Sequence, residues 1–196
     1  MNQASKLEAT LNLVKELDKL KQVIRRNYLL DGSRSENTAE HSWHAALSAL
    51  LLQEFANEAI DINKVVRMLL IHDVVEIEAG DTYLYDTAAE VGQAERELAA
   101  AHNIFSMLPG EEGDQYLQLW LEFENRESPE SKFAKAIDRF MPMLANYESG
   151  GKSWLENKVS RARILEINKI VADGSEALWH LIINMSTDAY NKGWLV

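Results

Sequence analysis

The sequence predicts an all-α fold, a single helical bundle of about eight helices that occupies residues 1–196. Only three prolines occur in the chain, and no segment alternates apolar and polar residues over the length of a strand. Apolar residues recur instead at intervals of three and four, as in Leu7, Leu11, Val14 and Leu17. No internal repeat, low-complexity tract or linker interrupts this pattern, so we expect one domain.

Capping and stop signals place the individual helices. Ser5 with Glu8 and Asn37 with Glu40 have the spacing of capping boxes, and Ser128 before Pro129 is a strong helix start. Glycines and prolines mark the ends of the helical patterns. The predicted helices cover about residues 5–24, 39–55, 61–80, 87–108, 111–125, 129–147, 153–172 and 176–191.

Composition excludes several classes of function. The chain has no cysteine, so disulfides and thiolate metal sites are ruled out. The net charge of -11 argues against a nucleic acid polymer or an anionic membrane as partner. The first residues, MNQASKLEAT, do not resemble a secretory signal, and no apolar run of about 18 residues occurs. We therefore predict a cytoplasmic protein.

The segment from Asn63 to Asp81 is the most unusual stretch. Nine of the thirteen residues from Val65 to Ile77 are aliphatic or Met, which predicts a buried helix, yet His72, Asp73 and Glu76 lie within it. An isolated buried carboxylate costs several kcal/mol, so it needs a paired charge, a hydrogen-bond network or a metal ion. In a helix, His72 and Glu76 share one face, and Asp73 points about 100° away. We interpret this segment as the floor of a metal site.

Other polar residues also conflict with their surroundings. His41 begins the second predicted helix, with His44 three residues later, and Asp138 falls within an apolar helical face. A lone helical histidine, such as His44, His102 or His180, is usually a core or surface residue, and a carboxylate at a helix end, such as Asp81, is as often a turn residue.

Four of the polar residues that conflict with their apolar surroundings nevertheless form one ligand set across three predicted helices. They are His41, His72, Asp73 and Asp138. Two imidazoles and two carboxylates suit one divalent transition metal, namely Mn, Co, Fe, Ni or Zn. Four protein ligands leave positions for water and substrate on an octahedral ion, which favours a catalytic over a structural site.

These residues resemble the H…HD…D pattern of the HD-domain metal-dependent phosphohydrolases, an all-α superfamily. The flanking residues resemble the branch that contains the bacterial 5'-deoxynucleotidases and their eukaryotic HD-domain relatives. The resemblance covers about residues 7–147, and the C-terminal helices at 153–191 add no recognised motif. The flanking motifs are Leu20-Lys21 with Arg25, Ala39-Glu40-His41-Ser42, His72-Asp73-x-x-Glu76-x-x-x-Gly80-Asp81, and Pro129-Glu130-Ser131-Lys132-Phe133 before Asp138.

The resemblance implies a role for each matched residue. His41, His72, Asp73 and Asp138 would bind one divalent metal. Glu76 would handle the proton of the nucleophilic water, Asp81 would contact the sugar or assist, and Arg25 would hold the phosphate. The resemblance also implies a homodimer.

The expected reaction is hydrolysis of (deoxy)ribonucleoside 5'-monophosphates to nucleoside and phosphate. A phosphate dianion needs forked cationic donors, which Arg25 and Arg34 of a local basic stretch could supply. Bacterial members carry an aromatic residue directly after the phosphate-binding arginine, which helps to exclude ribose. Arg26 occupies that place here, so a preference for 2'-deoxy sugars does not follow.

Two alternatives stay open from the sequence. One is an HD phosphodiesterase or pyrophosphohydrolase that acts on another nucleotide. The other is a non-catalytic helical interaction module in which the metal is a structural clamp and the acidic surface meets a basic partner. Glu76 and Asp81, which a clamp would not need, favour the enzyme.

Overall fold

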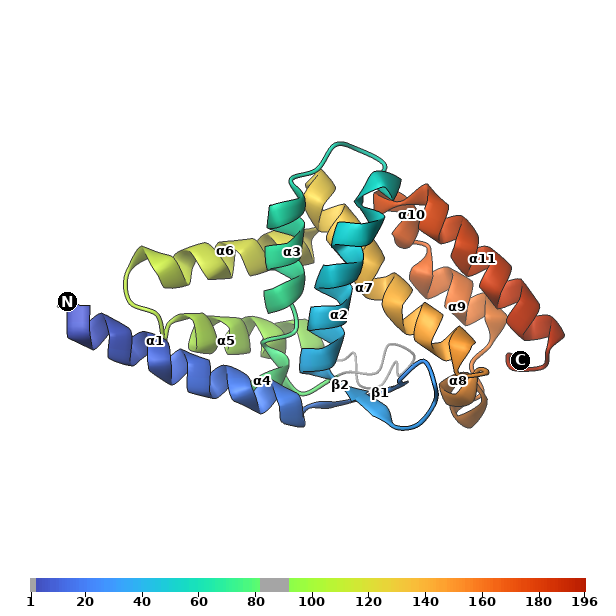
Figure 1. The fold of residues 1–196 in the computed structure, drawn as a ribbon, viewed down its shortest axis with the longest axis horizontal. Helices are drawn as coiled ribbons and strands as arrows, with labels where there is room; N and C mark the ends of the chain where they lie inside the picture. Colours follow the sequence, from blue (N-terminus) through green and yellow to red (C-terminus); the bar gives the residue numbers. More distant parts are fainter. Residues whose placement is uncertain (1–2, 82–91) are drawn as a thin grey trace.

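The computed structural model describes residues 3–81 and 92–196, and these are mostly helical, as predicted (Figure 1). Two short 3-10 helices, η1 (Asp18–Gln22) and η2 (Gln53–Phe55), follow α1 and α2. The helices are α1 (Gln3–Leu17), α2 (Thr38–Leu52), α3 (Ile62–Ile71), α4 (Glu76–Ala79), α5 (Gln93–Phe105), α6 (Glu111–Asn125), α7 (Pro129–Glu148), α8 (Lys152–Asn157), α9 (Arg161–Asn168), α10 (Val171–Gly174) and α11 (Glu176–Asn191).

Helix α7 lies at the centre of the arrangement and contacts α2, α3, α6, α10 and α11 (Figure 1). Its start is the predicted one, because the Ser128 side chain accepts a hydrogen bond from the Ser131 backbone N–H and Pro129 occupies the first turn. Eleven of its twenty residues are buried. A helix buried over so much of its surface can carry side chains into the interior from several sides.

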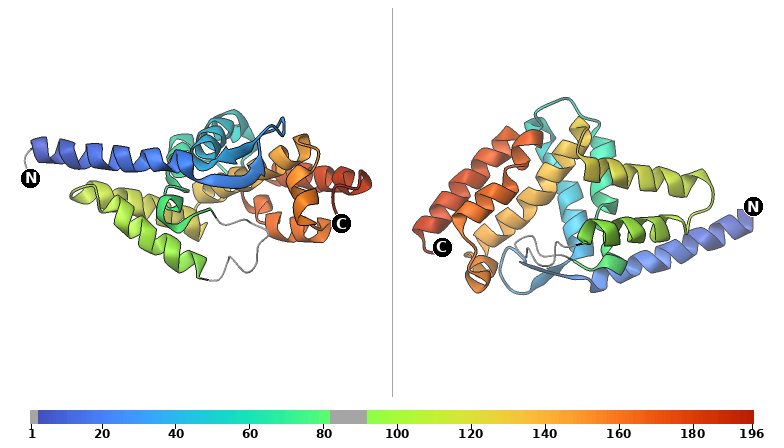
Figure 2. Two further views of the ribbon diagram at one scale, coloured as in Figure 1. Left: turned by 90° about the horizontal axis from the view of Figure 1, so that it is seen from below. Right: turned by 180° about the vertical axis from the view of Figure 1, so that it is seen from behind.

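Two apolar clusters pack on either side of the segment that follows α3. One joins α2, α3 and α7 with the C-terminal helices, and the other joins α1 and η1 with α4, α5 and α6. Figure 2 shows the same division, with α1, α5 and α6 extending away from the C-terminal helices. Ile71 packs against both clusters, so the residues directly after it lie where the two clusters meet.

The first predicted helix is wrong beyond η1. The chain there forms an antiparallel hairpin of β1 (Ile24–Tyr28) and β2 (Ser35–Asn37), with a turn at which Gly32 has a φ of 67°. The sequence does not predict strand β1, because the inward positions of this strand are polar. Arg25 and Asn27 are more buried than their neighbours Ile24 and Arg26, so no apolar alternation marks the strand.

The predicted helix at residues 61–80 is interrupted. Helix α3 ends at Ile71, residues 72–75 form a turn, and α4 follows. Within the turn, the N–H of Glu76 donates to the carbonyl of Asp73 at 3.0 Å instead of to that of His72. The indole N–H of Trp120 donates to the His72 carbonyl at 2.9 Å, so this buried acceptor keeps a partner. The turn therefore replaces the face-sharing of His72 and Glu76 that a continuous helix would give.

The other predicted helices agree in part. The stretch at 153–172 is divided into α8, α9 and α10, because Lys158 adopts a left-handed conformation and Ser160 caps a new helix. The predicted helix start at Thr87 lies outside the described residues, and α5 begins at Gln93. None of the described helices combines the length and apolarity needed to cross a membrane.

The close contact between α10 and α7 depends on a glycine. A Cβ atom at Gly174 would lie 2.2 Å from the carbonyl oxygen of Lys132. We expect Gly174→Ala to lower the free energy of unfolding by about 1–3 kcal/mol, because the two helices must separate. Chemical denaturation measures this change. Asp173→Ala, at the exposed neighbouring position of α10, is the control and should leave stability almost unchanged.

Candidate metal centre

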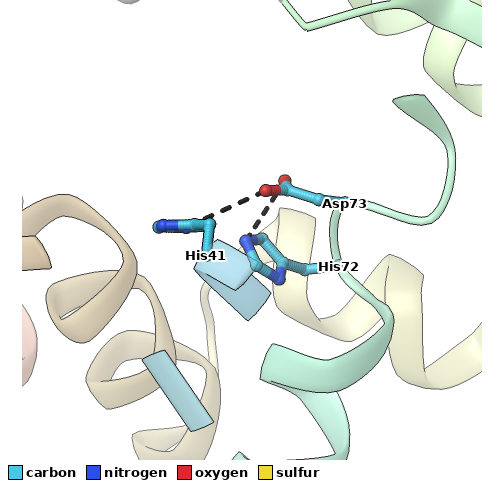
Figure 3. Close-up of side chains that lie close together, drawn as sticks. All are labelled: His41, His72 and Asp73. Atoms are coloured by element: carbon cyan, nitrogen blue, oxygen red, sulfur yellow. Dashed lines mark ion pairs between the residues drawn. The ribbon is translucent and has the colours of Figure 1, made fainter. Parts of the chain in front are cut away.

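Side chains from two distant parts of the chain, His41 and the adjacent pair His72 and Asp73, meet at the end of α3 (Figure 3). One ligand atom each from His41, His72 and Asp73 lies within 4.8 Å of the others. His41 is in the first turns of α2, whose start is fixed by the predicted capping box between Asn37 and Glu40. Both histidines are almost fully buried.

Asp138 of α7 completes the group. Its Oδ1 atom lies 3.2 Å from Nε2 of His41 and 3.4 Å from Nε2 of His72. Asp73 approaches the same two nitrogens, with Oδ1 3.1 Å from Nε2 of His72 and Oδ2 3.8 Å from Nε2 of His41. The structure thus brings together the four side chains that the sequence predicts as metal ligands, although they are up to 97 residues apart.

The protonation of His72 tests whether this group suits a cation. Its Nδ1 atom lies 2.9 Å from the carbonyl oxygen of Leu69, which can only accept, so Nδ1 carries the proton and donates. In the neutral imidazole, Nε2 therefore presents a lone pair. This buried nitrogen makes no hydrogen bond within residues 3–81 and 92–196, yet it faces the carboxylates of Asp73 and Asp138.

A lone pair that faces two carboxylates is repelled unless a cation lies between them. The titration of His72 reflects the same demand: burial lowers its pKa, but the carboxylates of Asp73 and Asp138 outweigh burial and raise the pKa to about 10. A metal ion meets this demand without a proton on Nε2, and the bond from Nδ1 to a backbone carbonyl is the usual way to orient a metal-binding histidine. The donor set fits a divalent transition metal.

Two further charged residues, which sequence reasoning missed, support the ligand set from outside. Glu36 of β2 places Oε2 3.5 Å from Nδ1 of His41, and Lys135 of α7 places Nζ 3.4 Å from Oδ2 of Asp138. The spacing of Lys135, three residues before Asp138 on one helix, was a usable signal. No such signal marks Glu36 in the sequence, because its contact with His41 depends on the fold of the hairpin.

The carboxylate of Asp73 also pairs with Arg25. The Nη1 atom of Arg25 lies 2.8 Å from Oδ2 of Asp73, 3.9 Å from Oε1 of Glu76 and 3.8 Å from Oδ1 of Asp81. Burial lowers the pKa of Arg25, but these carboxylates raise it by more than burial lowers it, so the guanidinium stays charged. Three predicted site residues, Arg25, Glu76 and Asp81, therefore lie beside the predicted ligands.

Glu76 is buried and strongly perturbed. Burial, followed by the charge of Asp73, raises its pKa to about 9, while Arg25 and a hydrogen bond from Thr38 act in the opposite direction. The Thr38 hydroxyl donates to Oε2 of Glu76 at 2.8 Å and fixes the carboxyl group. Burial also raises the pKa of Asp81. Glu76 can therefore hold or release a proton in the range where enzymes work.

The structure does not place Arg34, which the sequence predicts to bind substrate, among the residues of this group. Its guanidinium makes a two-pronged ion pair with Glu40, at 2.7 and 2.9 Å, on the exposed side of α2. Glu40 is the N3 residue of the capping box of α2, so Arg34 stabilises the start of this helix.

A cavity of about 350 Å³ opens beside the four predicted ligands, within the size range of small-molecule sites. Three of these ligands, His72, Asp73 and Asp138, line it together with Glu76. The remaining lining residues are Arg25, Arg26, Asn27, Val75, Asp81, Gln93, Ala94, Glu97, Glu124, Arg126, Lys135, Arg139 and Pro142.

Comparison with known structures shows the same fold elsewhere. A protein from Magnetospirillum magnetotacticum, described as a predicted metal-dependent phosphohydrolase, is 43% identical and superposes with a TM-score of 0.93, covering 98% of this chain and 96% of that one. A conserved hypothetical protein from Pyrococcus furiosus shares the fold at a TM-score of 0.61 and 21% identity, over 91% of this chain and 99% of that one.

Sequence comparison gives a consistent result. The 5'-deoxynucleotidase HDDC2 of Dictyostelium discoideum is 30% identical over 156 residues, which are 76% of this chain and 82% of the relative. The protein of the same name from Bos taurus is 28% identical over 154 residues, 77% of this chain and 71% of the relative. The HD domain family model matches residues 17–179, a range that contains all four predicted ligands. The chain therefore belongs to the HD-domain metal-dependent phosphohydrolases and is related to the HDDC2 group of 5'-deoxynucleotidases.

Proposed function

We propose that this phosphohydrolase cleaves (deoxy)ribonucleoside 5'-monophosphates to nucleoside and phosphate with one divalent transition metal. The observation that carries the proposal is the buried Nε2 atom of His72, which faces two carboxylates at the floor of a ligand-sized cavity. The names of the related 5'-deoxynucleotidases support the substrate class.

His41, His72, Asp73 and Asp138 would hold the ion, which supplies Lewis-acid catalysis to the phosphate ester and the attacking water when bound. Arg25 keeps the Asp73 carboxylate ionised. Although burial raises the pKa of Asp73, the neighbouring His72, Arg25 and His41 hold it well below the usual range. Lys135 acts likewise on Asp138 against burial. Both carboxylates are therefore in the form that binds a cation.

Glu76 is our candidate for proton transfer. Its pKa of about 9 means that it holds a proton at neutral pH, and the Thr38 hydroxyl fixes its orientation. A protonated carboxyl group at the cavity floor can deliver a proton to the leaving alkoxide, and its conjugate base can take one from the attacking water. Asp81, which lines the same cavity, is placed to contact the sugar.

The substrate in this proposal is a small phosphate ester and not a nucleic acid polymer, which agrees with the net charge of -11 and the enclosed position of the predicted ligands. Arg26 lines the cavity, so a cation occupies the place of the aromatic residue expected from the resemblance. The preference between ribose and deoxyribose is thus left to experiment. Homodimerisation, a cytoplasmic location and the single-domain organisation stay predictions from the sequence.

The ligand assignment makes a direct prediction. His72→Ala and Asp138→Ala should each lose most of the bound metal and with it the hydrolysis of nucleotides, because each removes a donor from a four-residue set. Elemental analysis of the purified variants measures the metal content. His102→Ala, which changes an exposed histidine of α5, should keep the wild-type content. Full occupancy in both ligand variants would remove these residues from the site.

The role of Glu76 separates chemistry from binding. We expect Glu76→Gln to keep the metal and the fold but to lower kcat by roughly 100- to 10,000-fold, the usual contribution of a general acid or base. Steady-state kinetics and elemental analysis together measure the two effects. Glu78→Gln in the same short helix is the matched control, since Glu78 does not line the cavity. Wild-type kcat in Glu76→Gln would exclude it from proton transfer.

A substrate panel tests the reaction itself. We expect free phosphate from ribo- and deoxyribonucleoside 5'-monophosphates assayed with Mn, Co and Zn in turn. Pyrophosphate or a linear monophosphate as product, from other nucleotides, would indicate the pyrophosphohydrolase or phosphodiesterase alternative. A large loss of thermal stability on chelation, without phosphate release from any substrate, would support the structural clamp.

A further inference from the structure

The cavity beside the predicted metal centre is lined by several cationic side chains, and these differ in how far their charge is already balanced. A bound phosphate dianion needs a cation that is free to turn towards it. The partners of each cation within the described residues therefore indicate which one is available. The lining cations are Arg25, Arg26, Arg126, Lys135 and Arg139.

Arg25 is engaged by carboxylates. Besides the 2.8 Å contact with Asp73, its guanidinium lies within 4 Å of Glu76, Asp81 and Glu36. A phosphate that approaches Arg25 also approaches these acids, which repel it. Arg25 alone is thus a weak site for a dianion.

Other cations of the lining are also occupied. Lys135 lies 3.4 Å from Asp138 and 3.6 Å from Glu124, and its ammonium group lies 4.2 Å from the centre of the Phe123 ring. Arg126 donates from Nε to the backbone carbonyl of Glu124 at 3.2 Å. Arg26 lies close enough to Asp81 for their charges to interact, and this interaction opposes the rise in the pKa of Asp81 that burial causes.

Arg139 differs from all of these. It is only partly exposed, and its guanidinium makes no hydrogen bond or ion pair with any residue in the ranges 3–81 and 92–196. Its Nε atom is fully buried without a partner there. Buried polar groups in proteins are nearly always paired, so an unpaired guanidinium at a cavity wall calls for an anionic ligand. The acidic excess of the chain, 31 Asp and Glu against 20 Lys and Arg, makes this lack of a partner more notable.

The surroundings of Arg139 keep it beside the predicted ligands. It follows Asp138 directly on α7 and lines the cavity together with Asn27 of β1. A hydrogen bond of 3.2 Å from Asn146 of α7 to Asn27 fastens the strand to the helix, and Asn146 also donates to the carbonyl of Pro142 at 2.9 Å. Arg139 on α7 and Arg25 on β1 therefore border the same cavity from two fastened elements.

We propose that Arg139 binds the phosphate group of the substrate. The inference rests on the proposed function for the identity of the ligand as a phosphate ester. The planar fork of a guanidinium matches two phosphate oxygens at once, which a lysine cannot reproduce. Arg139 adds to the wall that Arg25 also lines a positive charge that no carboxylate of the described residues balances.

The test compares Arg139→Met and Arg139→Lys with the wild type, all loaded with metal. Inorganic phosphate is titrated by calorimetry, and KM is measured for the nucleotide that the wild type hydrolyses best. We expect Arg139→Met to raise the dissociation constant of phosphate and KM by about ten- to a hundredfold, the loss of one charge-assisted contact. Arg139→Lys should weaken phosphate binding at least threefold, since it keeps the charge but not the fork.

Arg163→Met on α9 is the matched control, because Arg163 does not line the cavity, and it should bind phosphate as the wild type does. Metal content and melting temperature should be unchanged in Arg139→Met, and if that variant does not fold, Arg139→Lys decides. Phosphate binding within twofold of the wild type in the folded Arg139 variants would overturn the proposal, as would a wild type that binds no phosphate. A wild type that binds phosphate but hydrolyses no nucleotide would end the proposed function while the calorimetry still decides the role of Arg139.

Discussion

The arrangement depends on one electrostatic constraint, the approach of two aspartates to two imidazoles in the protein interior. The Nδ1–H group of His72 donates a hydrogen bond to the Leu69 carbonyl, so in the neutral imidazole Nε2 presents a lone pair to the carboxylates of Asp73 and Asp138. Such a cluster is stable only when a positive charge balances it. Arg25 and Lys135 provide part of that charge from the outside, and a metal ion in the middle would provide the rest.

The turn after α3 makes this approach geometrically feasible. A continuous helix would point His72 and Asp73 about 100° apart and leave them anchored to one axis. The tighter hydrogen bonding of residues 72–75 releases the His72 carbonyl, and Trp120 of α6 takes it up. The two apolar clusters meet at this point, so packing from both sides holds an otherwise unfavourable bend.

The hairpin supplies the remaining wall of the cavity. Its inward positions carry Arg25 and Asn27, and its second strand carries Glu36, which lies beside both His41 and Arg25. The contact between Asn27 and Asn146 ties the strand to α7. Helix α7 thus carries the predicted ligand Asp138, the neighbouring Lys135 and the anchor of the strand. It also carries Arg139, whose guanidinium has no partner within the part of the chain that the structure describes. Most of the buried residues of α7 are apolar and belong to the cluster that also joins α2, α3 and the C-terminal helices.

The sequence by itself determined the helical class, the start of α7 and the set of His41, His72, Asp73 and Asp138, because capping residues and polar residues within apolar faces are local signals. Only the tertiary structure decided the hairpin, the turn after α3, the outward pairing of Arg34, and the positions of Glu36 and Arg139. The physical reason is that a charged side chain has many candidate partners in a sequence, and packing between distant segments selects one. Local periodicity records which face is apolar, but it does not record which buried charge another element will meet.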